Sequence, residues 1–351
     1  MSTRCFLVAC VVLLGTTQIA EARLVGARGY LGLLERGAAM MKRKDLRGAE
    51  ATFGEAIAMS GKDPRGYYQR GVCRAAMGRA TQAAQDYRAA IARKPGFAEA
   101  HNNLGAILKD QGKNKVALTH LKRAVGIKKS YAEAWFNLGL TLSSMGRHGD
   151  AVKAYRRAAR LRPKDVDIHI NLGGALQRIN EIDKALAQLG LAVRLKGKDP
   201  VARCGYGELL ALKGRFEEAK RELKVATQVD SKYARAWAKW GLILARQGQG
   251  KQALTILRRG IKSAPPSVLL HVAIGKVHHR LGRFKQALGA YGAALRVDKT
   301  YPKTFLLMGL SSAALGQCKV ARRHFSRYLD IIGIARGKAL NQLMKRCNAH
   351  K

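Results

Sequence analysis

The chain contains little proline, little cysteine and few aromatic residues. It has 7 prolines and 6 cysteines among 351 residues, which excludes a proline-rich linker protein and a small disulfide-dense scaffold. Aromatic residues make up 6%, and there is no zinc-finger, basic-zipper or aromatic ribonucleoprotein motif, so specific nucleic-acid binding is not expected. Apolar residues nevertheless make up 47%, which is enough to bury a core. We therefore expect a globular protein.

Acidic residues are also scarce. There are 23 Asp and Glu residues against 65 Lys and Arg residues, which gives a formal net charge of +42. So much like charge needs a large surface to spread over, or an anionic partner to neutralise it.

The first 22 residues have the pattern of a secretory signal peptide. Arg4 supplies a positive start, residues 5–14 are apolar, and residues 20–22 (Ala-Glu-Ala) form a cleavage site, so cleavage is expected after Ala22. A lipoprotein box ending at Cys10 is the alternative, but the apolar stretch continues past Cys10 instead of ending there. No other segment is long and apolar enough to span a bilayer. We expect a soluble mature chain, extracellular or periplasmic, with a short lead over residues 23–29.

A 34-residue period runs through the remaining chain. Glycine recurs at Gly37, Gly71, Gly105, Gly139, Gly173, Gly207, Gly241, Gly275 and Gly309. Alanine follows twelve positions after each glycine, and a large residue follows four positions after each alanine. The period predicts nine units without insertions, over residues 30–63, 64–97, 98–131, 132–165, 166–199, 200–233, 234–267, 268–301 and 302–335.

Each unit has the apolar spacing of two helices. In the fourth unit, apolar or small residues at unit positions 4, 7, 8 and 11 mark one face of a first helix. Positions 20, 24 and 27 mark a second helix in the same way. Gly146 lies between them, where a left-handed residue would end the first helix. Asn180 and Lys44 replace this glycine in the fifth and first units.

These residues resemble the tetratricopeptide repeat family over residues 30–335. The resemblance implies an all-α fold, a right-handed α-solenoid of nine helix-turn-helix repeats. Units three to five, with His101–Gly105, Trp135–Gly139 and Ile170–Gly173, also resemble the repeat array of the O-linked N-acetylglucosamine transferases. The residues outside the repeats are too few to encode a sugar-transfer domain, so this likeness implies a scaffold. Residues 336–351 are predicted to form an amphipathic capping helix that completes one continuous rod.

In such an array the first helices line a concave groove, and unit positions 2, 6, 9 and 13 face into it. Position 6 holds Asn103, Asn137 and Asn171 in consecutive units. An amide side chain has donors and an acceptor for a peptide bond, so these residues predict contact with an extended polypeptide partner. The alternative is that Asn-Leu-Gly is a common sequence in this family and the amides are solvated.

Basic residues occupy the groove positions further along the chain. They are Arg235, Lys239, Arg246, Lys276 and Arg280. Family members that clamp acidic C-terminal tails use basic residues at such positions, which implies an acidic polypeptide. They also need Asn and Lys in the two preceding units, where this chain has Ile170, Gly174 and Gly205, so a complete carboxylate clamp is not expected. The alternative is a solvated basic face.

Most of the positive charge falls on the second helices, in two belts separated by the less charged fifth and sixth units. The belts include Arg88, Lys122, Arg123, Arg156, Arg157, Arg258 and Arg259. They predict an alternative function, the binding of an anionic glycan or lipid headgroup through counterion release. The alternative is that this positive charge binds no ligand and only keeps the surface solvated.

We expect no enzymatic activity, cofactor or metal. His101, His169 and His271 all occupy unit position 4, where other units have aromatic residues, so packing explains them better than catalysis. There is no phosphate-binding glycine loop, nucleophile elbow or HExxH pair.

The last prediction concerns the cysteines. Cys318 begins the second helix of the ninth unit, and Cys347 lies near the end of the capping helix. Their midpoint falls between Ile332 and Gly333, where the chain turns between the two helices, so the two cysteines should lie level and form a disulfide; two free thiols are the alternative. Cys73 and Cys204 are four repeats apart and are expected to be buried and unpaired.

Overall fold

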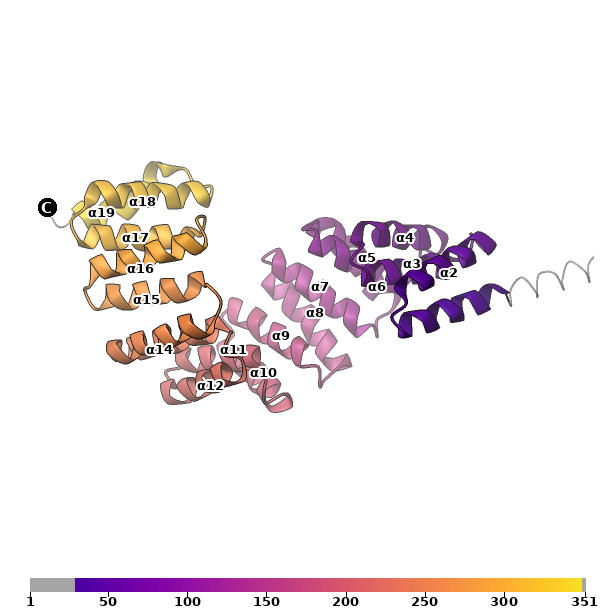
Figure 1. Cartoon of the computed structure of the whole chain (residues 1–351), viewed down its shortest axis with the longest axis horizontal. Helices are drawn as coiled ribbons and strands as arrows, with labels where there is room; N and C mark the ends of the chain where they lie inside the picture. The colour runs from indigo at the N-terminus through magenta and orange to yellow at the C-terminus, as the bar shows by residue number, and fades with distance from the viewer. Residues whose placement is uncertain (1–28, 349–351) are drawn as a thin grey trace, which may run out of the picture. The chain divides into compact units, whose positions relative to one another are not determined.

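The computed structural model describes residues 29–348, which form helices and short turns and contain no strand (Figure 1). None of these helices is long and apolar enough to cross a membrane. The predicted signal peptide lies outside the described residues. The first helix covers residues 29–42. It is followed by α2 (Leu46–Met59), α3 (Pro64–Ala76), α4 (Ala80–Arg93), α5 (Ala98–Asp110), α6 (Asn114–Ile127), α7 (Ala132–Ser144), α8 (His148–Leu161), α9 (Val166–Arg178), α10 (Ile182–Leu195), α11 (Pro200–Leu212), α12 (Phe216–Val229), α13 (Ala234–Arg246), α14 (Gly250–Ser263), α15 (Val268–Arg280), α16 (Phe284–Val297), α17 (Pro302–Ala314), α18 (Cys318–Ile331) and α19 (Arg336–Asn348).

The helices form two compact units, Met1–Ile168 and His169–Lys351, and the boundary falls inside α9. Each unit is described by itself. The 34-residue period passes through Ile168 unchanged, which is why the sequence indicates no division there. The continuous rod stays a prediction.

Within each unit the helices follow the predicted repeat. Each first helix packs on its own second helix, as α3 does on α4 and α15 on α16. It also packs on the second helix of the preceding repeat, as α5 does on α4. Helices with these two contacts bury one face against each neighbour, which confirms the architecture of helix-turn-helix repeats.

The repeated glycines allow the two helices of a repeat to approach. A methyl group at Gly71 would lie 2.7 Å from Tyr87 Cε1, and one at Gly105 would lie 2.6 Å from Leu121 Cγ. The other repeats pair the same two positions, in Gly37–Phe53, Gly139–Tyr155, Gly173–Leu189, Gly207–Leu223, Gly241–Leu257, Gly275–Tyr291 and Gly309–Phe325. A side chain at the repeated glycine would therefore collide with the large residue of the second helix. The alanine four positions before that large residue contributes less to the requirement for glycine.

The buried face of the first helices is wider than the sequence predicts. Unit position 3 is buried as well, for example at Ala100 and Ala202, and so is position 10 at Cys73 and Leu209. Burial at position 4 varies between repeats, because His101 and His169 are buried whereas Trp135 is only half-buried. The added positions are those that the second helix of the preceding repeat covers.

The predicted turns have the expected backbone. Gly146 has φ +74°, and Asn180 adopts the same left-handed conformation with φ 62°. Lys44 also has φ 63°, so the first repeat keeps this turn at the cost of placing a side chain where glycine is favoured.

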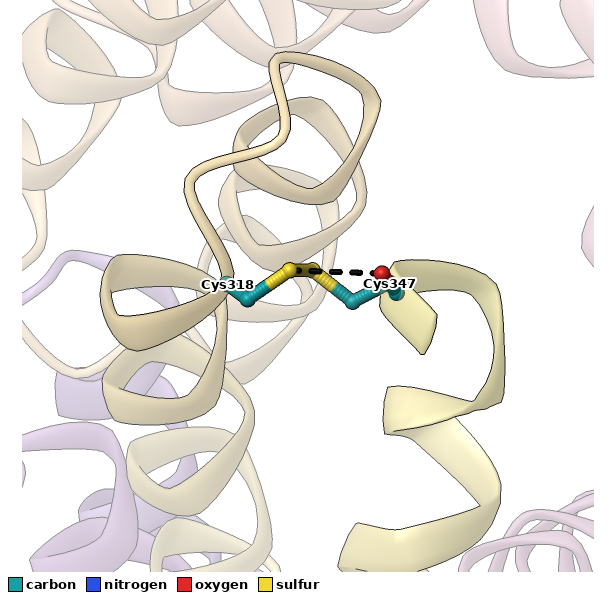
Figure 2. Close-up of a disulfide and its surroundings, with 2 residues drawn as sticks. All are labelled: Cys318 and Cys347. Atoms are coloured by element: carbon teal, nitrogen blue, oxygen red, sulfur yellow. Dashed lines mark hydrogen bonds between the residues drawn. A yellow bond between two sulfur atoms is a disulfide. The ribbon is translucent and has the colours of Figure 1, made fainter. Parts of the chain in front are cut away.

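The end of the second unit contains the predicted capping helix and disulfide. Helix α19 packs on α18 and α17, with Leu340 and Cys347 buried. Figure 2 shows the bond between Cys318 on α18 and Cys347 on α19, whose Cα atoms are 5.7 Å apart. Gly333 turns the chain between these helices with φ +69°. The predicted pairing is thus present, and Cys73 and Cys204 are buried and free, as predicted.

Candidate functional site

Two of the three predicted asparagines belong to a hydrogen-bonded network on the first helices. Asn137 Nδ2 donates to Asn102 Oδ1 over 2.9 Å, and Asn102 Nδ2 donates to Asn103 Oδ1 over 3.1 Å. Asn103 Nδ2 lies 3.4 Å from the hydroxyls of both Tyr68 and Tyr87. Asn102, which is 0% exposed, therefore connects two groove positions in consecutive repeats.

The asparagines differ in how many of their hydrogen-bonding groups the network leaves free for a ligand. Both Nδ2 hydrogens of Asn103 have tyrosine acceptors, and its Oδ1 already accepts one hydrogen bond. Asn137 uses one hydrogen on Asn102 and keeps its second N–H and its Oδ1 for a ligand, since it makes no other side-chain hydrogen bond within residues 29–348. Asn171 is half-buried and lies on the part of α9 that belongs to the second unit.

The basic groove residues divide into two groups. Arg235 and Lys239, on α13, both contact the carboxylate of Glu208 on α11, with Arg235 Nη2 3.4 Å from Glu208 Oε2. Glu208 thus neutralises part of the positive charge that was expected, from the sequence, to bind an acidic ligand.

The other three predicted residues line one cavity without an acidic neighbour. Arg246, Lys276 and Arg280 come together around a volume of about 360 Å³ between α13, α15 and α17. None of the residues that line this cavity is acidic, and within residues 29–348 none of the three cations forms an ion pair. The apolar part of the lining includes Leu307 and Leu310. We call this the α13–α15–α17 cavity.

A half-buried lysine and a buried tyrosine make the α13–α15–α17 cavity suited to an anion. The pKa of Lys276 is lowered, first by burial and then by the like charges of Lys303 and Lys239. Tyr291 is 0% exposed, and its hydroxyl, at the cavity, has no hydrogen-bond partner within the described residues. An anionic oxygen in the cavity would offset both costs, because it would accept a hydrogen bond from the Tyr291 hydroxyl and neutralise charge around Lys276.

The residues predicted to form the basic belts lie on the second helices of both units. Arg88, Lys122, Arg123, Arg156, Arg258 and Arg259 are exposed, and Arg157 is half-buried. They are accessible to solvent, and their role as a binding surface stays a prediction.

The histidines at unit position 4 take part in packing contacts. His101 Nδ1 lies 3.0 Å from His120 Nδ1, and His101 Nε2 lies 3.1 Å from the carbonyl oxygen of Pro95. His169 pairs similarly with Gln188 over 2.8 Å. The part of the chain that the structure describes contains no group of three His, Cys, Asp or Glu side chains that could hold a metal ion.

Sequence reasoning missed Asn102 and Glu208. Asn102 occupies unit position 5, between the predicted core and groove positions, and the Asn-Asn pair at 102 and 103 was the available signal. Glu208 occupies groove position 9, one repeat before Lys239. Comparing groove positions between consecutive repeats, instead of within one repeat, would have placed this carboxylate beside the two cations.

Comparison with protein families gives matches over most of the repeats. One model described as "Tetratricopeptide repeat" matches residues 34–96, 136–200 and 233–304, which is more than half of the chain. A second model with the same description matches residues 96–164. No curated protein matches the chain significantly.

Solved structures show the same fold. A tetratricopeptide repeat protein from Parabacteroides merdae has a TM-score of 0.54 and 16% identity, over 81% of this chain and 99% of that one. The pilF protein of Pseudomonas aeruginosa has a TM-score of 0.55 and 16% identity, over 60% of this chain and 96% of that one. A protein described as YrrB, "a TPR protein with an unusual peptide-binding site", has 25% identity and a TM-score of 0.46, over 53% and 96%.

Proposed function

Because the chain belongs to the tetratricopeptide repeat family, a family of protein-interaction scaffolds, we propose that it holds an extended, acidic stretch of polypeptide against its first helices. The observation that carries this proposal is the α13–α15–α17 cavity. Three cations without acidic partners surround a buried tyrosine hydroxyl that has no partner within residues 29–348. A Glu or Asp side chain would supply the missing negative charge and the missing acceptor.

The shape of the cavity also favours a side chain on a polypeptide. The aliphatic lining, with Leu307 and Leu310, would contact the methylene groups of a glutamate while its carboxylate reaches Lys276. Arg246 lies over the ring of Phe216, with its guanidinium carbon 5.3 Å from the ring centroid, and this contact restricts the side chain before a ligand binds. A cation held in place loses less entropy on binding.

Asn137 lies in the first unit and would contact polypeptide there, apart from the cavity of the second unit. Its free N–H and Oδ1 can pair with one peptide bond whatever the neighbouring side chains are. Asn103 contributes less to this contact, because its amide is already shared with Tyr68 and Tyr87. We therefore propose that Asn137 supports backbone recognition within the first unit, and that the α13–α15–α17 cavity supplies the preference for acidic sequences within the second unit.

The test is a binding measurement with a labelled polyglutamate peptide and a polyglutamine peptide as its uncharged match. Arg246→Gln combined with Arg280→Gln should weaken polyglutamate binding about tenfold or more, since a hydrogen bond to a charged group contributes about 1.5–3 kcal/mol. Polyglutamine binding should change little.

The matched control is Arg258→Gln combined with Arg259→Gln on α14. It removes the same charge from exposed positions of the same compact unit. If the control variant weakens polyglutamate binding as much as the cavity variant does, the peptide is attracted by the overall positive charge and not by the cavity. The basic belts, with an anionic glycan or lipid headgroup as ligand, would then be the better assignment.

We further propose that the protein acts outside the cytosol after cleavage behind Ala22. The support is the pattern of residues 1–22 together with a disulfide, a bond that persists in oxidising compartments. N-terminal sequencing of the mature protein should begin at Arg23. A mature protein that still begins at Met1 would overturn this assignment.

A further inference from the structure

A second cavity in the second unit is lined by residues of α12 and α14, together with Trp240 and Leu244 of α13. Its volume is about 430 Å³, which lies within the range of about 300–1,000 Å³ that small-molecule sites occupy. It shares no residue with the α13–α15–α17 cavity. We call it the α12–α14 cavity.

The α12–α14 cavity has an apolar part built around Trp240. This indole stacks on Trp237, with ring centroids 5.9 Å apart and an angle of 18° between the planes. Leu244 and Ile256 complete the apolar lining and are 5% and 9% exposed. Trp240 itself is only half-buried, although unit position 7 holds buried leucines in other repeats. Trp240 is therefore the most accessible apolar residue of the α12–α14 cavity.

Cations surround this apolar part. Arg221, Lys224 and Arg259 line the cavity and are exposed, and none of the three forms an ion pair within the described residues. The lining has a single acidic residue, Glu217, which forms an ion pair with Lys220, with Lys220 Nζ 2.7 Å from Glu217 Oε1. The cavity thus combines an indole with three cations that make no direct ion pair within residues 29–348, although the charge of Arg221 helps to lower the pKa of Glu217 and Glu218.

We propose that the α12–α14 cavity binds a small amphipathic anion, a carboxylate attached to an alkyl or aromatic body. The body would lie on the half-buried Trp240, beside Leu244 and Ile256, and remove the exposed part of the indole from water. The carboxylate would lie among Arg221, Lys224 and Arg259, where arginine offers bidentate hydrogen bonds. A neutral alkyl compound would gain only the first contribution, and an alkyl cation would be repelled.

The test is a calorimetric titration of the full chain with decanoate below the concentration at which it forms micelles, with decanol as the uncharged match. Decanoate should bind more tightly than decanol. Arg221→Gln combined with Arg259→Gln should weaken decanoate about tenfold or more and leave decanol unchanged. Both substitutions are at exposed positions, so the fold should persist, which circular dichroism checks.

The matched control is Arg322→Gln combined with Arg323→Gln on α18, which removes the same charge from exposed positions that line neither cavity and should leave decanoate binding unchanged. Three results would overturn the proposal: no binding of decanoate, equal binding of decanol, or equal weakening by both pairs of substitutions. Failure of polyglutamate binding would not affect it, because the two cavities have no residue in common.

Discussion

Asn137 donates a 2.9 Å hydrogen bond to Asn102, the residue 35 positions before it in the neighbouring repeat. The two Nδ2 hydrogens of Asn102 are shared among Asn103 Oδ1, the Tyr131 hydroxyl and the Glu133 carboxylate, so one fully buried amide joins two repeats. The groove surface in this unit is therefore supported by a polar network and not only by apolar packing.

Asn102→Ala should lower the free energy of unfolding of the first unit by about 1–3 kcal/mol, since it leaves buried hydrogen-bonding groups without partners. Asn137→Ala, at a half-buried position, should cost less. Urea denaturation followed by circular dichroism measures both. Equal costs for the two substitutions would show that Asn102 is not the centre of the network.

Alanine should have opposite effects at two glycines of the first unit. Gly71→Ala should destabilise by about 1–3 kcal/mol, because its methyl group would lie 2.7 Å from the Tyr87 ring. Gly54→Ala in α2 should stabilise by up to about 1 kcal/mol, because no atom lies within 4 Å and alanine favours the helix. Thermal unfolding compares them. A neutral Gly71→Ala would contradict the close approach of the two helices.

The Cys318–Cys347 disulfide should hold α19 on the last repeat. Cys318→Ser combined with Cys347→Ser should increase hydrogen exchange in α19, with a loss of roughly 3–4 kcal/mol by the loop-entropy relation for a separation of 29 residues. The matched control is Cys73→Ala with Cys204→Ala, which removes two free thiols. Alkylation of both Cys318 and Cys347 in the unreduced protein would show that the bridge does not form.

The His101–His120 pair should make the first unit less stable in mild acid. The pKa of each ring is lowered, mainly because burial disfavours the charged form, and His120 is also repelled by His101. Protons therefore bind the unfolded chain more tightly, so stability is complete above the unfolded pKa of about 6.5 and decreases below it, towards the lowered folded values.

Hydrogen exchange in α5 and α6 as a function of pH measures this effect. His120→Gln should reduce the loss of protection in acid, because it recreates the pairing of His169 with Gln188. An unchanged pH dependence in this variant would assign the effect to other groups.

Much of the fold could be predicted because one period controls it. The same glycine, alanine and large residue recur in every repeat, so Gly146 and Cys318 could be placed on their turn and helix from spacing alone. The candidate site was harder to predict from the sequence, because it depends on differences between repeats. Glu208 pairs with Lys239 across two first helices, and the Tyr291 hydroxyl reaches a cavity formed by three others. A repeat pattern describes only what equivalent positions share, so it does not predict contacts between side chains at non-equivalent positions.

The division of the chain at Ile168 was not predictable for a related reason. The repeat pattern describes which residues face a neighbouring helix, and this pattern is the same on both sides of His169. The central claim, that an acidic polypeptide lies on the first helices, therefore has to be tested in one unit at a time.

The most direct measurement is site-specific photo-crosslinking of a polyglutamate peptide in the second unit. A photoreactive side chain replaces either Leu307, which lines the α13–α15–α17 cavity, or Arg323, an exposed residue of α18 on the second-helix surface. We predict a crosslink from position 307 that excess unlabelled peptide removes, and little crosslink from position 323. A crosslink from position 323 with none from position 307 would contradict the account.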